Sequence, residues 1–257
     1  MITKEVCQIV SHKEIAADIF KLTVEAKFVG QIKAPGQFVH IRVTNGWDPL
    51  LRRPISISSF DKKKNQLTMI YRREGKGTQL LSQLDTGKVV DILGPLGNGF
   101  PVGEVDKGQI ALLVGGGIGV PPLYELSKQL TEKGVIVKHV LGFQSESHVF
   151  YKKEFSNYGE TIVTTVDGSY GVKGLVTDVI KNLSFDCIFT CGPTPMLRAI
   201  KQEYSNKKVF LSLEERMGCG IGACFACVCK TGNDPLGNSY KKICSDGPVF
   251  RAEEVLI

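Results

Sequence analysis

The sequence predicts a multidomain protein of the α/β plus β class, with an antiparallel β-barrel first, a parallel-sheet α/β domain second and a small C-terminal segment third. Apolar and polar residues alternate in short runs through roughly the first hundred positions, as in half-buried antiparallel strands. Continuous apolar runs separated by helical patterns follow, which is typical of a buried parallel sheet. After Glu215 no helical period remains, and cysteine and glycine accumulate.

The predicted barrel domain covers residues 1–99. Six short strands broken by turns can close into such a barrel. A cluster of turn-forming residues from Gly94 to Pro101 marks the boundary with the next domain. The expected strands are Val6–Val10, Ile19–Val24, Phe38–Val43, Ile55–Ser58, Leu67–Arg72 and Val89–Leu93.

The α/β domain is expected over residues 100–213, and residues 214–257 form the third segment. Strands that alternate with helices in this way build a sheet of the nucleotide-binding type. The expected strands are Ile110–Val114, Ile136–Leu141, Ile162–Val166, Ile188–Thr190 and Val209–Leu213.

Composition narrows the classes of function. The chain has 257 residues, of which 42% are hydrophobic, enough for two ordinary cores and a small appendage. Its net charge of +6 is spread over doublets such as Arg52-Arg53 and Lys207-Lys208, a pattern of solvated faces that does not favour nucleic-acid binding. No signal peptide or apolar membrane segment opens the chain, and eight cysteines suit a reducing compartment. We therefore expect a cytoplasmic protein.

Four of the cysteines stand among glycines in the spacing C-x4-C-x2-C-x16-C, and they are Cys219, Cys224, Cys227 and Cys244. Plant-type ferredoxins hold a 2Fe-2S cluster with this spacing, and glycines let the backbone approach the sulfurs. A zinc site is the alternative, although zinc sites usually pair their cysteines as two C-x2-C units. Disulfides fit a reducing compartment poorly.

The remaining cysteines have other expected roles. Cys7 and Cys187 lie in apolar runs and are expected to be small core residues. Cys229 follows Cys227 by two positions and would point the same way in a strand, so it is a reserve ligand.

A constellation in the barrel domain suits a flavin nucleotide. The Arg53 guanidinium can clamp a pyrophosphate with two hydrogen bonds, and the Ser56 hydroxyl could reach the flavin ring. Tyr71 could stack on an aromatic ring of the cofactor. Gly77 and Thr78 suit a helix N-terminus that attracts phosphate. The candidate residues are Arg53, Pro54, Ile55, Ser56, Ile70, Tyr71, Arg72, Gly77 and Thr78.

A glycine-rich turn in the α/β domain suits a second nucleotide. The strand Ile110–Val114 runs directly into a loop with glycines at Gly115, Gly116, Gly117 and Gly119, whose backbone can cradle a pyrophosphate. The loop lacks the G-x-G-x-x-G fingerprint, and a tight strand-to-helix turn is the alternative interpretation. No arginine follows Leu141 to bind a 2′-phosphate, which favours NAD over NADP.

The order of these parts resembles the ferredoxin-NADP reductase superfamily, in which an FAD-binding barrel with an R-x-[YF]-S-like motif precedes a nucleotide-binding domain. Here the motif is Arg53-Pro54-Ile55-Ser56, with isoleucine in place of the usual aromatic residue. The resemblance also places Cys191 and Gly192, in the turn Cys191–Met196, beside the site of hydride transfer. Pro195 in the first turn of a helix explains the same turn without a cofactor.

With the cysteine segment added, the whole chain resembles the electron-transfer subunits of dihydroorotate dehydrogenase B. The most specific element is the E-x-x-M-x-C-G-x-G-x-C run from Glu214 to Cys224. The resemblance implies an NAD-reducing subunit of an oxidoreductase in pyrimidine (UMP) biosynthesis, which passes electrons from the FMN of a catalytic partner through the 2Fe-2S cluster and FAD to NAD. The implied complex is a heterotetramer with two copies of each chain.

Two features agree with a partner that carries the substrate chemistry. A TIM-barrel catalytic part needs about 250 residues, and none are left for it here. The four histidines are scattered along the sequence, so we expect each to be structural or exposed and no catalytic acid or base in this chain. The apolar residues Ile221, Ala223, Phe225 and Ala226 either face the partner or pack internally.

Two other functions stay open. An NADH-dependent flavin and iron-sulfur reductase feeding an oxygenase, a hydrogenase or a sulfite-reducing partner would use the same cofactors. A zinc-stabilised nucleotide sensor would keep the glycine-rich loop and need no flavin.

Overall fold

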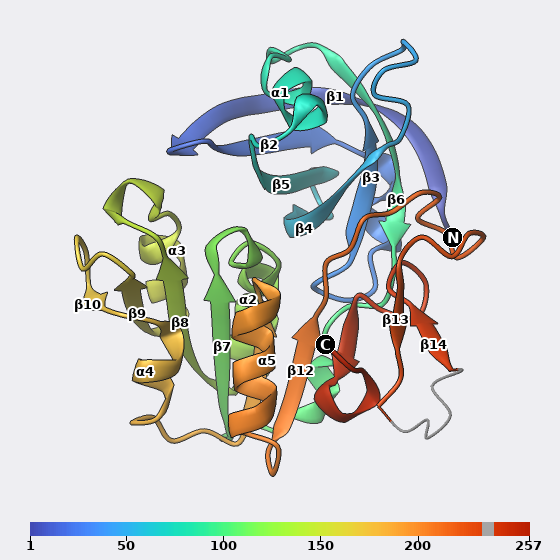
Figure 1. Ribbon diagram of the computed structural model, residues 1–257. Helices are drawn as coiled ribbons and strands as arrows, with labels where there is room; N and C mark the ends of the chain where they lie inside the picture. Colours follow the sequence, from blue (N-terminus) through green and yellow to red (C-terminus); the bar gives the residue numbers. More distant parts are fainter. Residues whose placement is uncertain (233–238) are drawn as a thin grey trace.

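The computed structural model describes residues 1–232 and 239–257. A closed six-stranded barrel stands beside a seven-stranded sheet, and the C-terminal segment runs along the side of both (Figure 1). Within the described residues, no helix is long and apolar enough to cross a bilayer.

The six predicted barrel strands are all present, in the order β1-β2-β5-β4-β3-β6. All their pairings are antiparallel, and β1 reaches further along the chain than expected because its first half pairs with β6 and its second half with β2. Irregularities in its register near Ser11 and Ala16 allow it to bend between these partners. The strands are β1 (Thr3–Ala16), β2 (Ile19–Glu25), β3 (Phe38–Arg42), β4 (Arg53–Asp61), β5 (Gln66–Arg72) and β6 (Val89–Leu96).

The second sheet has the order β10-β9-β8-β7-β11-β12-β15, and its pairings are parallel except that of β12 with β15. Successive residues of β7 pack into different cores, Leu113 with the α2 helix and Leu112 with α4 and α5, so helices cover both faces as the apolar runs predict. The strands are β7 (Ile110–Gly116), β8 (Ile136–Phe143), β9 (Gly159–Thr165), β10 (Val172–Lys173), β11 (Cys187–Cys191), β12 (Lys208–Ser212) and β15 (Val249–Arg251).

Helices are short apart from two. The helices are α1 (Lys76–Ser82), α2 (Pro122–Glu132), α3 (Lys152–Ser156), α4 (Val176–Ile180) and α5 (Thr194–Glu203), with 3-10 turns at Lys27–Gln31, Val102–Glu104, Gly117–Gly119, Glu146–His148 and Ala252–Glu254.

The C-terminal segment is not a free appendage. Its strand β15 pairs with β12, with Leu211 opposite Phe250, while β13 (Val228–Lys230) and β14 (Tyr240–Lys242) form a separate antiparallel pair. The Asn98 side-chain amide donates to the carbonyl oxygens of Ser245 and Asp246, at 2.9 and 3.2 Å. The segment is thus anchored to the sheet and to the end of the barrel domain.

Candidate functional site

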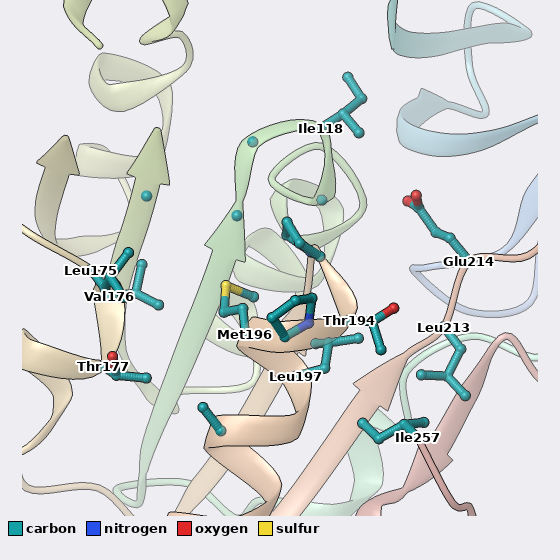
Figure 2. Close-up of a pocket in the computed structure, with 18 of the residues that line it drawn as sticks. Ile118, Leu175, Val176, Thr177, Thr194, Met196, Leu197, Leu213, Glu214 and Ile257 are labelled. Carbon is teal, nitrogen blue, oxygen red and sulfur yellow. The ribbon is translucent and has the colours of Figure 1, made fainter. Parts of the chain in front are cut away.

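A cavity of about 820 Å³ opens at the carboxyl edge of the parallel sheet, between the barrel and the C-terminal segment. Figure 2 shows Met196, Thr194 and Val176 on its α/β side, with Glu214 on the side of the C-terminal segment. The carboxyl edge of a parallel sheet is where nucleotide ligands bind in such folds. Most of the lining comes from positions where parallel strands end, so the fold itself creates this cavity.

The glycine loop and the Cys191-Gly192 turn, which lie far apart in the sequence, form one wall of the cavity. A Cβ on Gly119 would lie 2.3 Å from the carbonyl oxygen of Cys191, and one on Gly116 would lie 2.8 Å from the Met196 sulfur. Gly117, in contrast, has φ +53°, and a Cβ added to it would meet no atom within 4 Å. The loop is therefore closed against its neighbour on one side and has an open backbone on the other, which is what a phosphate cradle requires.

The Cys191 side chain does not reach this wall. It is fully buried, and burial, helped by the Glu214 charge, raises the pKa of its thiol well above the ordinary value. Only the backbone at Gly192 lines the cavity. If a nicotinamide binds here, it can therefore lie beside the backbone of this turn but not beside the Cys191 thiol.

Sequence reasoning missed several residues of this cavity. Thr164 at the end of β9 is buried, and its hydroxyl has no hydrogen-bond partner among the described residues. Cys229, Leu256 and Ile257 reach the cavity from the C-terminal segment. Nothing local in the sequence distinguishes these residues, because only the topology brings them to the sheet edge.

Glu214 is one of three charged residues in the lining, together with Arg72 and Glu215. Its side chain is accessible to solvent, yet it lines the cavity together with Arg72 of β5. Desolvation by the surrounding protein raises the pKa of Glu214, and the charge of Arg72 opposes this shift. Arg72 also forms an ion pair of 2.7 Å with Glu74, so one cation balances two carboxylates at the mouth.

The two halves of the predicted flavin motif meet in the structure. The Arg53 guanidinium, at the start of β4, rests on Gly77 in the first turn of α1, where a Cβ would come within 2.1 Å of its Nε atom. Only glycine permits this approach, and it places a fixed cation beside the free N–H groups of a helix start. The Thr78 hydroxyl accepts hydrogen bonds from the backbone N–H groups of Glu74 and Gly75 at 3.0 and 3.1 Å. These residues fit the pyrophosphate of a flavin nucleotide.

The prediction that the Tyr71 ring stacks on a cofactor is wrong, because the ring lies in the core of the barrel. Tyr71 is 1% exposed, its ring stacks on Phe20 at 5.8 Å, and its hydroxyl is hydrogen-bonded to His12 at 2.9 Å. Ile70 is buried as well and packs with Ile19. Because both side chains are buried, Ile70 and Tyr71 can offer a cofactor only their backbone. An aromatic residue in an alternating strand is more often a core residue than a stacking partner.

The four predicted ligand cysteines gather in one place. The Cys224 N–H donates to the Cys219 sulfur at 3.3 Å, and the Gly222 N–H donates to the Cys244 sulfur at 3.2 Å. Cys227 and Cys244 are buried and interact through their side chains. Sulfurs that accept backbone N–H bonds within a glycine-rich loop are the surroundings that an iron-sulfur cluster needs.

The ionisation of these thiols differs across the site. Partial burial alone would raise the pKa of Cys219, but hydrogen bonds from the backbone of Ile221 and Cys224 lower it to about 6. Burial, together with the neighbouring Cys227, raises the pKa of Cys244 to about 12. The donor set is therefore four cysteines of which one is already poised as a thiolate, and it fits a 2Fe-2S group. Among the described residues, no three histidine, cysteine or acidic side chains are arranged around a single ion.

The other cysteines lie elsewhere. Cys7 and Cys187 are in the core as predicted, and burial raises the pKa of each to about 12. Cys229 lines the large cavity, and partial burial raises the pKa of its thiol.

The cysteine loop rests on the barrel through one glycine. Gly220 has φ +72°, and a Cβ on it would lie 2.6 to 2.9 Å from Cε1, Nδ1 and Nε2 of His40 in β3. His40 is fully buried, and neither ring nitrogen has a hydrogen-bond partner among the described residues. Burial, followed by the charge of Arg52, lowers the pKa of His40 to about 4. The expectation that every histidine is merely structural or exposed leaves these two orphaned nitrogens unexplained.

The apolar residues of the cysteine loop point outward. Phe225 is 58% exposed and Ile221 49% exposed, and Ala223 and Ala226 are exposed too. Phe225 contacts the Tyr240 ring edge-on at 5.3 Å and lies under the Lys242 ammonium at 4.8 Å. Internal packing of these four residues, one of the two expectations, is thus not what the structure shows.

Comparison with known proteins agrees with this arrangement. Residues 6–100 match the model of the oxidoreductase FAD-binding domain, and residues 214–256 match the iron-sulfur cluster binding domain of dihydroorotate dehydrogenase B. The dihydroorotate dehydrogenase B (NAD(+)) electron transfer subunit of Bacillus cereus strain ATCC 14579 is 58% identical, and the match covers 100% of both chains.

Solved structures share the fold. That of an NADH-dependent reduced ferredoxin-NADP oxidoreductase has a TM-score of 0.85 at 32% identity, covering 98% of this chain and 90% of that chain. A ferredoxin NADP+ reductase from Neisseria gonorrhoeae, with bound FAD and NADP, has a TM-score of 0.66 at 14% identity, covering 80% of this chain and 91% of that chain. The second likeness concerns the fold alone.

Proposed function

Because this chain belongs to the family of electron-transfer subunits of dihydroorotate dehydrogenase B, we propose that it passes electrons from a catalytic partner chain to NAD with the aid of a 2Fe-2S cluster and FAD. It is the NAD-reducing part of an oxidoreductase that serves pyrimidine (UMP) biosynthesis. The oxidation of dihydroorotate takes place on the partner chain.

One observation carries this proposal more than any other. The cysteine loop packs on β3 at His40, and His40 pairs across the strands with Pro54 of the flavin motif in β4. The glycine-rich cavity of the α/β domain opens toward the barrel on another side, with Arg72 of β5 in its lining. The flavin motif therefore stands between the cysteine loop and the dinucleotide cavity, in the order that transfer from a one-electron to a hydride carrier needs.

Each part of the chain has a definite task. When bound, the cluster supplies single-electron chemistry, NAD accepts a hydride, and FAD connects the two. Arg53 and Gly77 hold the flavin pyrophosphate. Gly117 and Gly192 present backbone to the dinucleotide. The four cysteines hold the cluster, and the N–H groups of Gly222 and Cys224 stabilise negative charge on sulfur.

The partner is an FMN-containing catalytic chain, with two copies of each chain in the complex. A docking site for this partner is supported by the exposed apolar side chains of the cysteine loop. These side chains are Ile221, Ala223, Phe225 and Ala226. The protein works in the cytoplasm, where its free thiols stay reduced.

Anaerobic purification followed by absorption spectroscopy and analysis for iron, sulfide and FAD tests the cofactors. Brown-yellow protein with flavin and iron-sulfur bands is expected, and colourless protein with zinc would contradict the proposal. Mixing with the catalytic partner, dihydroorotate and NAD tests the direction. NADH should form only when both chains are present.

A second function has one observation in its favour. The likeness to the NADH-dependent reduced ferredoxin-NADP oxidoreductase extends over 98% of this chain at 32% identity, so a reductase that draws electrons from NADH could use the same fold. Electron delivery from NADH to a ferredoxin or an oxygenase, faster than NAD reduction with the catalytic partner, would favour that function.

A further inference from the structure

His40 is the one buried histidine whose ring has no polar partner among the described residues. Both ring nitrogens are enclosed and unpaired, although a neutral imidazole carries one donor and one acceptor. Leaving such groups unpaired in the interior costs stability, and native proteins rarely do so without a reason. A phenylalanine or leucine would fill the same space without that cost.

The surroundings of His40 suggest what completes it. The ring edge formed by Nδ1, Cε1 and Nε2 lies directly against Gly220, between the predicted ligands Cys219 and Cys224. Phe38, two residues earlier in β3, packs edge-on against the same ring, with the ring centroids 5.8 Å apart. The polar edge of the ring therefore faces the cysteine loop.

Gly220 fixes this approach. Its left-handed backbone and the distances of 2.6 to 2.9 Å exclude any side chain at this position. The loop can come this close to β3 only because the glycine lacks a Cβ, and the close approach brings the imidazole next to the residue that follows the predicted ligand Cys219.

We propose that His40 is a positioning residue for the iron-sulfur centre, with a ring N–H that donates a hydrogen bond to a sulfur of the bound cluster. This inference rests on the proposed function. Hydrogen bonds to cluster sulfur stabilise the reduced, more negative state and so raise the reduction potential. His40 thereby adjusts the energy at which electrons leave the cluster for the flavin whose motif is on the neighbouring strand.

His139 provides a matched control. It is buried to a similar degree in the α/β domain, but its two ring nitrogens are hydrogen-bonded to Ser127 and Thr161 at 2.8 and 2.9 Å. Replacement of either histidine by phenylalanine removes an imidazole from the interior. Only the change at position 40 should affect the cluster.

Pulsed EPR on the reduced holoprotein, grown with ¹⁵N-histidine, tests the hydrogen bond without any mutation. We expect a weak hyperfine coupling between the cluster and a histidine nitrogen in the wild-type protein and in His139→Phe, and its loss in His40→Phe. Wild-type protein with full iron and sulfide content but no histidine coupling would overturn the inference, even if His40→Phe fails to fold. A water molecule would then be the partner of the ring.

Redox titration of the same proteins gives the energetic effect. In His40→Phe the cluster should be about tenfold harder to reduce, which corresponds to a midpoint about 59 mV more negative for one electron, while the FAD midpoint stays unchanged. His40→Gln, which keeps an N–H donor, should recover part of the shift. An unchanged cluster midpoint in His40→Phe would contradict the proposal. Wild-type protein without iron or sulfide would instead refute the proposed function itself.

Discussion

The two glycine-rich loops of this molecule, residues 115–119 and 218–222, use glycine for different kinds of contact. In the first, Gly119 lets backbone pack on backbone, against the Cys191 carbonyl. In the second, glycine lets backbone approach side chains, with Gly220 against the His40 ring and the Gly222 N–H directed to the Cys244 sulfur.

The difference has a physical consequence for how each site is formed. The first loop continues a buried parallel strand, so its shape is fixed by the sheet before any ligand arrives. The second loop contains no helix or strand. It is held by hydrogen bonds from its N–H groups to thiols, by a bond from the Lys242 ammonium to the Gly222 carbonyl oxygen and by the packing of Gly220 on His40. We infer that the dinucleotide cavity is preformed, whereas the cysteine loop needs its cluster to become rigid.

The largest effect is expected for Cys224→Ser, which removes a cluster ligand. Iron and sulfide content in anaerobically isolated protein should fall to a small fraction of the wild-type value, while FAD remains bound. Cys229→Ser is the matched control because Cys229 lines the cavity instead, and it should retain the cluster. Full iron and sulfide in Cys224→Ser would break the assignment of the second loop.

The second effect is a loss of stability in acid, which we expect from His139 in the sheet beneath the first loop. Burial lowers the pKa of His139 from 6.5 to about 4, so between these values the unfolded chain binds a proton that the folded chain does not. The free energy of unfolding should therefore decrease as pH falls from about 6.5 to about 4, by up to about 3 kcal/mol from this group.

Urea unfolding at several pH values, compared between wild type and His139→Gln, measures this contribution. The variant should show a shallower dependence on pH across the window. Parallel curves for the two proteins would mean that His139 is solvated or protonated in the folded protein. Water would then reach the sheet beneath the first loop.

A smaller effect is the difference in stability between alanine substitutions at two glycines of the first loop. Gly119→Ala should destabilise the protein by about 2 kcal/mol, because its Cβ would press on the Cys191 carbonyl. Gly117→Ala has open space and should cost only about 1 kcal/mol, from its left-handed backbone. Urea unfolding and the KM for NAD(H) check both. Equal losses would show that the contact with Cys191 is not what shapes the loop.

The smallest effect is expected on the outer side of the second loop. Phe225→Asp should weaken assembly with the catalytic partner by about tenfold, in the range of a single interface contact, and leave FAD bound. Size-exclusion chromatography over a range of concentrations measures this. Lys62 is distant in sequence and contacts the Phe60 ring of the barrel, so Lys62→Asp serves as a charge control. Normal assembly of Phe225→Asp would exclude this docking face.

Local sequence patterns were sufficient for much of the architecture. All six barrel strands and five of the six strands with parallel pairings in the described sheet could be predicted, because alternation and continuous apolar runs reflect which faces are buried. The two-residue strand β10 was missed because it is too short to give a pattern. The core positions of Cys7 and Cys187 followed from the same patterns. Cysteine spacing was equally informative about which four sulfurs collect.

What could not be predicted depends on contacts between distant segments. The orphaned ring of His40 becomes visible only when Gly220, 180 positions later, lies on it. Tyr71 has the residue type of a stacking partner, yet the closure of the barrel turns its ring toward Phe20 and His12. Strand β15 is too short to give a period, and it is ordered by its pairing with β12.

That pairing makes the cysteine segment an insertion between two neighbouring strands and not a detachable cassette. Removal of the chain after Leu213 would strip β12 of its outer neighbour and leave a bare sheet edge, which invites aggregation. A graft of residues 214–257 onto another flavoprotein would in turn lose the strand that ends it. Exchange of cluster modules between relatives should therefore succeed only when the adjoining sheet edge is transplanted with them.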